Sequence, residues 1–131
     1  RRAETWKTPW HLLLRIESKR LFVFNGRKIV RSFPVVIGKP STPTPAGRFY
    51  VEEAIILPRG ALGGPDAFAL SARSNVYQEF EGGPGQIAIH GVQGIGGTPG
   101  TAVSHGCIRA TSEALQFMVH RFGTGTPIDI R

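Results

Sequence analysis

One cysteine and two histidines stand close together in the second half of the chain. Cys107 is the only cysteine among 131 residues, His105 precedes it by two positions, and His90 follows an apolar run. A cysteine attacks as its thiolate, and a nearby imidazole lowers the thiol pKa from about 8.5 toward neutrality or below. The histidine takes the thiol proton and later returns it to a leaving amine, so these residue types predict covalent acyl transfer through Cys107.

The residues on either side of Cys107 predict a turn that presents backbone groups to a substrate. Gly106 has no side chain to block the approach, so the N–H groups of Gly106 and Cys107 are the expected oxyanion donors. Ser104 is predicted to stabilise the turn through its hydroxyl, and a direct role stays open. Arg109 has a planar guanidinium that suits a substrate carboxylate; bracing the turn or forming a surface ion pair are its alternatives.

The residue types alone leave the role of general base open between His90 and His105. His90 is delivered by a predicted strand, whereas neighbouring side chains on a tight turn tend to point apart. This favours His90 as the base and His105 as a supporting residue. No Asp or Glu lies within residues 83–111, so we expect a backbone carbonyl, that of Gly91, to hold the Nδ1–H of His90.

The same stretch carries a family resemblance. The run Ser-His-Gly-Cys-Ile-Arg at 104–109, preceded by a spaced His-Gly pair, resembles the signature of the YkuD-type L,D-transpeptidases, cysteine enzymes of bacterial cell-wall cross-linking. The Pro-rich segment 38–49 resembles a second landmark of that family, and the similarity extends over about 11–130. The resemblance implies that Cys107 is the nucleophile, His90 the general base and His105 a supporting residue.

The resemblance also implies a reaction. Cys107 would form a thioester with a tetrapeptide stem of peptidoglycan, releasing D-Ala, and an amine acceptor would complete a 3→3 cross-link. Water as the acceptor would make the protein an L,D-carboxypeptidase. The implied inhibitors are carbapenem-type β-lactams, and no cofactor, metal or nucleic acid is expected. We expect a monomer acting outside the cytoplasm, in the periplasm or cell wall, with a signal or anchor not present in this chain.

Two rival hypotheses use the same residues. Cys107, His105 and His90 can supply three metal ligands with an open fourth position, but the spacing lacks a Cys-x-x-Cys or His-Glu-x-x-His core. A non-catalytic cell-wall-binding module would keep the fold without the reaction. The intact set of cysteine and histidines argues against such a module, because a binder has no need of all three.

The length and composition of the chain limit the fold classes that it can adopt. The chain has the length of one domain, 40% apolar residues, and 17 Gly and 10 Pro that favour a β-rich fold over a helical bundle. No apolar run approaches the roughly 20 residues that span a bilayer, and residues 1–10 contain no apolar core of a signal peptide. The net charge of +7 is spread along the chain, which we interpret as attraction to an anionic wall.

We expect residues 1–10 to be a linker or frayed end and 11–131 to form the catalytic domain. Apolar alternation and turn residues predict strands at 11–17, 20–24, 28–37, 48–51, 54–57, 67–72, 86–89 and 128–130. Asn25-Gly26 predicts a type I′ hairpin turn, and Pro34 an edge position or a bulge. Residues 91–100, with five glycines, predict a mobile connection between base and nucleophile.

One helix is expected over 111–122, with an apolar stripe at 115, 118, 119 and 122. Thr111 or Ser112 can cap its start, and Gly123 its end. The expected fold is therefore mainly β. The resemblance implies the mixed sheet or sandwich of the YkuD-type L,D-transpeptidase fold, with one α-helix packed after the catalytic cysteine.

Overall fold

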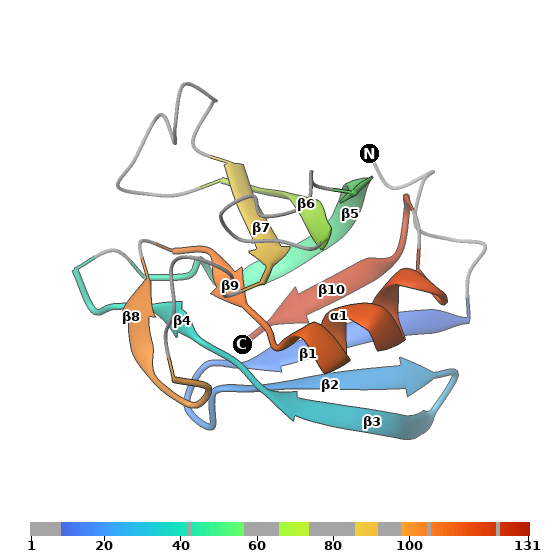
Figure 1. The fold of residues 1–131 in the computed structure, drawn as a ribbon, viewed down its shortest axis with the longest axis horizontal. Helices are drawn as coiled ribbons and strands as arrows, with labels where there is room; N and C mark the ends of the chain where they lie inside the picture. The colour runs from blue at the N-terminus through green and yellow to red at the C-terminus, as the bar shows by residue number, and fades with distance from the viewer. Residues whose placement is uncertain are drawn as a thin grey trace.

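The computed structural model describes residues 9–41, 43–56, 66–73, 86–91, 98–104, 106–122 and 124–131. Ten strands and one helix lie within these ranges (Figure 1). In chain order they are β1 (Trp10–Arg15), β2 (Arg20–Asn25), β3 (Lys28–Pro34), β4 (Ile37–Gly38), β5 (Gly47–Ile56), β6 (Asp66–Arg73), β7 (Gln86–His90), β8 (Ala102–Ser104), β9 (Ile108–Arg109), α1 (Ser112–Val119) and β10 (Pro127–Ile130).

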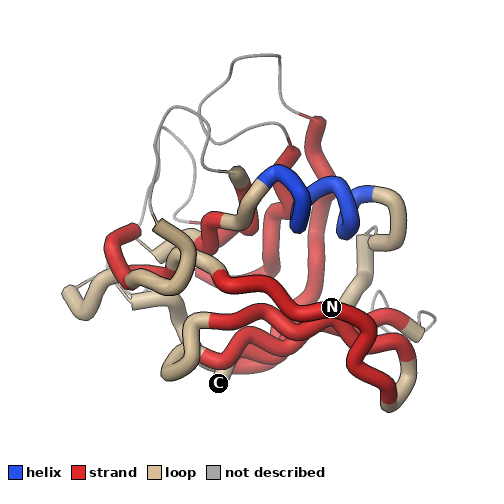
Figure 2. The backbone as a smooth tube through the Cα atoms, turned by 60° about the horizontal axis from the view of Figure 1, so that its bottom comes forward, coloured by secondary structure: helices blue, strands red, loops and turns tan. Residues whose placement is uncertain are grey.

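Eight of these strands form one mixed sheet in the order β3-β2-β1-β10-β5-β6-β7-β9, and β4 and β8 form a small second sheet. The β1–β10 and β7–β9 pairs are parallel, and the other pairs of the large sheet are antiparallel. The large sheet curls around α1, which lies on its concave side (Figure 2). The expectation of a mainly β, mixed-sheet fold with one helix after Cys107 is confirmed.

The core lies between the concave face of the sheet and the helix. Alternate residues of each strand point to opposite faces, so Leu12 and Leu14 of β1 are buried while their neighbour Leu13 is only half-buried. The helix contributes Leu115 and Met118, both fully buried. Burial thus follows the predicted apolar stripe at Leu115 and Met118, whereas Val119 of that stripe is only half-buried.

The helix begins as predicted and ends earlier. Thr111 is the N-cap, and its hydroxyl accepts a hydrogen bond from the N–H of Ala114 at 3.2 Å. The helix ends at Val119, not at 122, and His120 is the C-cap. Phe122 is nevertheless buried. Its N–H donates a hydrogen bond to the carbonyl of Met118 at 2.9 Å, which holds Phe122 in the turn that follows the helix. Gly123, the predicted end cap, lies outside the described residues.

The N-cap gives a stability prediction. Thr111→Ala should lower the free energy of unfolding by about 1 kcal/mol, because one N–H of the first helical turn loses its acceptor. Urea denaturation measures this difference. Thr111→Ser keeps a hydroxyl at the same position and should retain most of the stability. Equal midpoints for the alanine variant and the parent would show that the cap contributes nothing.

The hairpin of β2 and β3 is confirmed, but its predicted turn type is wrong. Asn25 pairs with Lys28, so the central residues of the turn are Gly26 and Arg27 rather than Asn25 and Gly26. Gly26 has φ of 62°, and the only described non-glycine residue with positive φ is Lys19. A type I′ turn needs positive φ at both central residues, which Arg27 does not provide.

Strand boundaries differ from expectation at three places. The predicted strand 28–37 ends at Pro34, on the edge strand β3, as expected for a residue without an N–H donor. Its last residues turn away to form β4. The strands predicted at 48–51 and 54–57 are one strand, β5, with an irregular register between Val51 and Glu53. β1 begins at Trp10, inside the expected linker; residues 1–8 lie outside the described residues.

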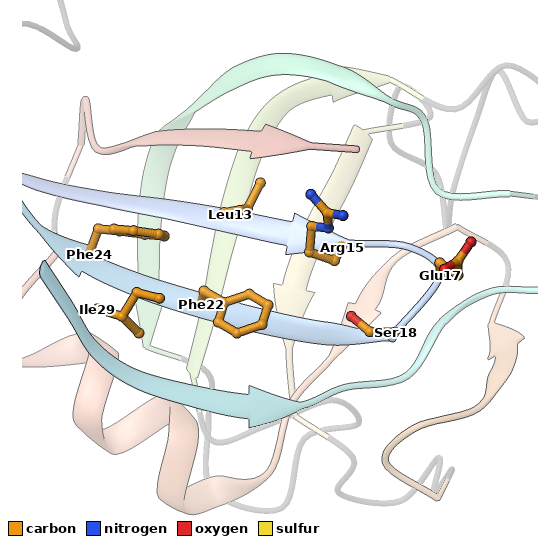
Figure 3. Close-up of a pocket in the computed structure, with 7 residues that line it drawn as sticks. All are labelled: Leu13, Arg15, Glu17, Ser18, Phe22, Phe24 and Ile29. Atoms are coloured by element: carbon orange, nitrogen blue, oxygen red, sulfur yellow. The ribbon is translucent and has the colours of Figure 1, made fainter. Parts of the chain in front are cut away.

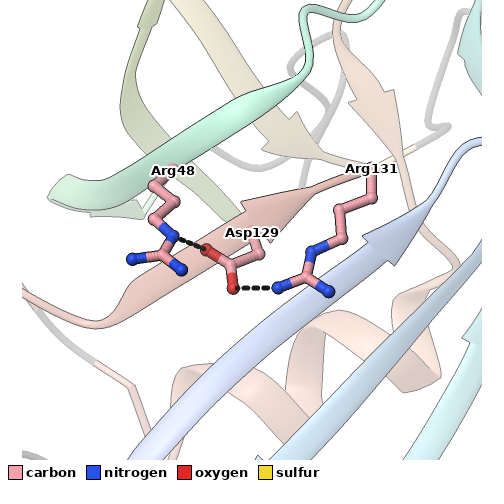
Figure 4. A network of polar contacts seen from close by, with 3 residues as sticks. All are labelled: Arg48, Asp129 and Arg131. Atoms are coloured by element: carbon pink, nitrogen blue, oxygen red, sulfur yellow. Dashed lines mark hydrogen bonds and ion pairs between the residues drawn. The ribbon is translucent and has the colours of Figure 1, made fainter.

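The convex face of β1, β2 and β3 carries a shallow apolar hollow (Figure 3). Its lining consists of four apolar residues, Leu13, Phe22, Phe24 and Ile29, together with Arg15, Glu17 and Ser18 at one end, and Ile29 is 52% exposed. On the neighbouring strands of the same sheet, Asp129 approaches Arg48 at 3.9 Å and Arg131 at 3.5 Å (Figure 4). These pairs reach solvent and contribute little to stability. No helix in the described part of the chain is long and apolar enough to cross a membrane.

Candidate active site

His90 and the strand that follows Cys107 lie side by side. His90 ends β7, and β7 pairs in parallel with β9, so that Ile89 faces Ile108 and His90 faces Arg109. The carbonyl of His90 accepts a hydrogen bond from the N–H of Ala110 at 2.8 Å. Cys107 immediately precedes β9. Two segments separated by a glycine-rich connection therefore meet at one edge of the sheet (Figure 1).

Burial places the chemically active side chains on the face away from the core. Ile89 and Ile108 are fully buried, whereas their neighbours His90, Cys107 and Arg109 are half-buried. Cross-strand partners share a face and successive residues alternate. His90 and Arg109 therefore share the face opposite to Ile89 and Ile108, and Cys107, which immediately precedes Ile108, is half-buried like them.

The orientation of the His90 ring is held by its own neighbour. Nδ1 of His90 lies 2.8 Å from the carbonyl oxygen of Gly91, which confirms the contact predicted from the lack of nearby carboxylates. A carbonyl only accepts hydrogen bonds, so Nδ1 must carry the proton. The neutral ring then keeps a lone pair on Nε2, which is the form that accepts a proton.

Ser104 stabilises the turn that contains Cys107, as predicted. The Ser104 side chain is 1% exposed, and its Oγ accepts from the N–H of Gly106 at 3.1 Å and donates to the carbonyl of Cys107 at 2.6 Å. The N–H of Gly106, one of the two expected oxyanion donors, is thus already engaged within the turn.

Gly106 occupies a backbone conformation that favours glycine. Its φ is 122°, outside the regions that L-residues with a Cβ occupy readily. The predicted supporting residue, His105, lies outside the described residues, as do 92–97 of the predicted mobile connection.

Gly106→Ala should therefore lose both stability and reactivity. We expect about 1–3 kcal/mol of strain and a displaced Cys107, measured as urea stability and as the rate of thiol acylation. Gly26→Ala is the matched control, because Gly26 also has positive φ, 62°, but has open space where a Cβ would stand. The control should lose stability without losing reactivity. An alanine variant at 106 that reacts at the parent rate would contradict this account.

Residues 35–39 are hydrogen-bonded to the chain segments before and after the turn that contains Cys107. Val36 exchanges two hydrogen bonds of 2.9 Å with Arg109, after Cys107. Ile37 donates to Thr101 at 3.0 Å, and Lys39 donates to Ser104 at 2.9 Å, both before Cys107. β4 and β8 form their small parallel sheet through this segment. The sequence did not predict β8 or β9, because both are too short to show periodicity.

One residue of the Pro-rich segment reaches the turn directly. Thr44 is 4% exposed; its Oγ1 accepts from the N–H of Gly38 at 2.9 Å and donates to the carbonyl of Gly106 at 2.7 Å. This contact shows that the Pro-rich segment supports the turn, although no sequence pattern singled out Thr44.

No group of three or more His, Cys, Asp or Glu residues within the described ranges is arranged to hold a metal ion. His105, which the alternative metal-site hypothesis requires, is not among the described residues. Of the three groups that hypothesis names, the structure places His90 and Cys107 on neighbouring segments.

Comparisons with known proteins agree with this arrangement. Residues 9–130 match the family model YkuD, the L,D-transpeptidase catalytic domain. A putative L,D-transpeptidase YkuD of Bacillus subtilis is 28% identical over 127 residues, covering 97% of this chain and 69% of that protein. L,D-transpeptidase 1 of Mycobacterium tuberculosis is 27% identical over 123 residues, covering 88% of this chain and 47% of that protein.

The fold is shared with solved structures. The structure of the LD transpeptidase LdtMt1 in complex with imipenem has a TM-score of 0.67 and 21% sequence identity, covering 94% of this chain and 59% of that one. The chain thus spans about half to two thirds of the length of these relatives. Because the family model covers nearly the whole chain, the chain belongs to the YkuD family of L,D-transpeptidase catalytic domains.

Proposed function

We propose that this domain is a peptidoglycan L,D-transpeptidase in which Cys107 is the nucleophile and His90 the general base. The observation that carries the proposal is the β7–β9 register, which sets His90 and the segment of Cys107 on one accessible face. The Gly91 carbonyl supports the assignment, because it holds Nδ1–H and leaves Nε2 of His90 to accept the thiol proton.

In the acylation step, Nε2 of His90 takes the proton of the Cys107 thiol. The sulfur attacks the carbonyl carbon of the third residue of a tetrapeptide stem, forming a tetrahedral intermediate. The C–N bond to D-Ala then breaks, and the imidazolium returns its proton to the leaving amine. The product is a thioester on Cys107 and a released D-Ala.

In the transfer step, the side-chain amine of a second stem attacks the thioester. His90 takes a proton from the attacking amine and returns it to the cysteine sulfur as the C–S bond breaks. The new amide is the 3→3 cross-link. Water in place of the amine would give a shortened stem, which is the L,D-carboxypeptidase reaction.

The developing oxyanion needs fixed N–H donors, each of which contributes about 10²–10³ in rate in comparable enzymes. The N–H of Gly106 already donates to Ser104. The N–H of Cys107 is the other expected oxyanion donor, and we assign the leading role to it. Arg109 shares the accessible face and is assigned to the carboxylate of a stem peptide. His105 is assigned a supporting role beside the nucleophile.

The same site would be acylated by carbapenem-type β-lactams, because their strained amide presents a carbonyl to Cys107. The imipenem complex of a structural neighbour supports this assignment. Since peptidoglycan lies outside the cytoplasmic membrane, the proposed place of action is extracytoplasmic.

Two assays test the proposal. Incubation with a purified tetrapeptide stem, followed by mass spectrometry of the products, should show released D-Ala and a stem dimer. A shortened stem without dimer would indicate the carboxypeptidase instead. Incubation with imipenem should add the drug mass to Cys107. A protein that binds peptidoglycan but gives neither product nor adduct would be a non-catalytic wall-binding module.

A further inference from the structure

We infer that Thr44 is a positioning residue that fixes the direction of the Cys107 N–H. This inference rests on the proposed function, since it concerns the donor assigned there to the oxyanion. Thr44 touches neither the thiol proton nor the substrate in this scheme. It acts through the peptide unit that joins Gly106 to Cys107.

The first step of the argument is the hydrogen bond itself. Oγ1 of Thr44 donates to the carbonyl of Gly106 at 2.7 Å, across 62 positions of the chain, and this contact is buried. The same oxygen accepts from the N–H of Gly38 at 2.9 Å. The hydroxyl is therefore oriented: its proton must point to Gly106, because its other contact is with a donor.

The second step follows from the geometry of the peptide bond. The carbonyl of Gly106 and the N–H of Cys107 belong to one planar trans unit, in which the C=O and N–H bonds point in opposite directions. Holding the carbonyl against Thr44 therefore aims the N–H of Cys107 the opposite way. Glycine has the widest backbone freedom of any residue, so without this bond the unit next to Gly106 is the one most easily rotated.

The hydroxyl of Ser104 is hydrogen-bonded to the peptide units on either side of the Gly106–Cys107 unit, and Thr44 is hydrogen-bonded to the Gly106–Cys107 unit itself. Its hydroxyl accepts from the N–H of Gly106, in the unit before, and donates to the carbonyl of Cys107, in the unit after. Three successive peptide units around the nucleophile are thus fixed by two buried hydroxyls. The hydroxyl of Thr44 acts on the unit that contains the Cys107 N–H.

The segment that carries Thr44 is itself constrained. Pro43 and Pro45 flank it, and a residue before proline is restricted to extended conformations. Gly38, the donor to Thr44, lies in β4 and pairs with Ser104 of β8. The N–H of Lys39 adds a bond of 2.9 Å to the carbonyl of Ser104. The residues that hold Thr44 are therefore hydrogen-bonded to the same turn whose peptide unit Thr44 orients.

The test compares two reactions of the same thiol. Acylation by imipenem passes through an oxyanion, whereas alkylation by iodoacetamide needs the thiolate but forms no oxyanion. Thr44→Val keeps the shape of the side chain and removes the hydroxyl. We expect it to slow acylation by about 10- to 100-fold, since small misplacements of catalytic groups have effects of this size. Alkylation should stay within about twofold of the parent, and Thr44→Ser should restore acylation.

Two further measurements make the result decisive. Thr126→Val is the matched control, because Thr126 is another buried threonine, 3% exposed, immediately before β10; its acylation rate should equal that of the parent. Residual dipolar couplings of ¹⁵N-labelled protein report the direction of the Cys107 N–H without any reaction. The coupling should change in Thr44→Val and not in Thr44→Ser.

Unchanged acylation and an unchanged coupling in Thr44→Val would overturn the inference. A parallel loss of acylation and alkylation would also overturn it, because Thr44 would then support the thiol or the fold rather than the oxyanion donor. Thr44→Ala repeats the comparison if the valine variant does not fold. A parent protein that never reacts with imipenem or stem peptide would instead refute the proposed function, while the couplings still decide whether Thr44 orients the peptide unit.

Discussion

Replacing Cys107 with alanine is expected to abolish formation of the imipenem adduct and of the stem dimer. The variant has no atom that can form the thioester, so the remaining rate should fall by a factor on the order of 10⁴ or more. Intact-protein mass spectrometry after incubation with imipenem measures the adduct. Chromatography with mass detection of stem products measures transfer.

The fold should survive this change. Cys107 is only half-buried and lies in a turn, so the substitution removes one sulfur atom without opening a cavity in the core. The thermal midpoint should remain close to that of the parent. Cys107→Ser should also be nearly inactive, because a hydroxyl is far less acidic than a thiol and needs a stronger base. Stem dimer formed at a substantial rate by the alanine variant would refute the mechanism.

Strands with a regular burial pattern could be predicted from the sequence. In β1 and β2 buried and half-buried residues alternate, because one face packs on the core and the other faces outward. The helix was predictable for the same reason, with Leu115 and Met118 on one buried stripe. In these elements local periodicity and tertiary packing agree.

The short strands could not be predicted, because their pairing is decided elsewhere in the chain. β8 has three residues and β9 has two, too few for a period of two to be recognised. Their partners are β4 and β7, which are distant in sequence. The turn of the β2–β3 hairpin was misplaced for a related reason: the register of β2 and β3 puts Gly26 and Arg27 at its centre.

The candidate site was predictable where a single residue determines the contact. Because residues 83–111 contain no Asp or Glu, the carbonyl of Gly91 was the expected acceptor for the His90 ring, and it is used. Thr44 was not predictable, because its partner Gly106 lies 62 positions away and a buried hydroxyl leaves no periodic pattern. The residue types of a catalytic site can be recognised in a sequence more readily than the side chains that hold its backbone.

His90 carries the second large expected effect. His90→Ala should slow acylation by imipenem at neutral pH by more than the roughly 10²–10⁴-fold typical of acid–base assistance, because the same ring also generates the thiolate. The loss should shrink as the pH rises past about 8.5, where an unassisted thiol ionises on its own. A series of acylation rates from pH 6 to 10, on parent and variant, measures both the loss and its recovery.

His90→Gln separates proton transfer from positioning. A glutamine amide can donate to the carbonyl of Gly91, as Nδ1 of His90 does at 2.8 Å, but it cannot take a proton from the thiol. If His90 is the base, the glutamine and alanine variants should be almost equally slow at neutral pH. Rescue by glutamine would mean that the ring only positions the turn. Acylation by both variants at the parent rate would transfer the role of base to His105, whose replacement by alanine would then cause the large loss.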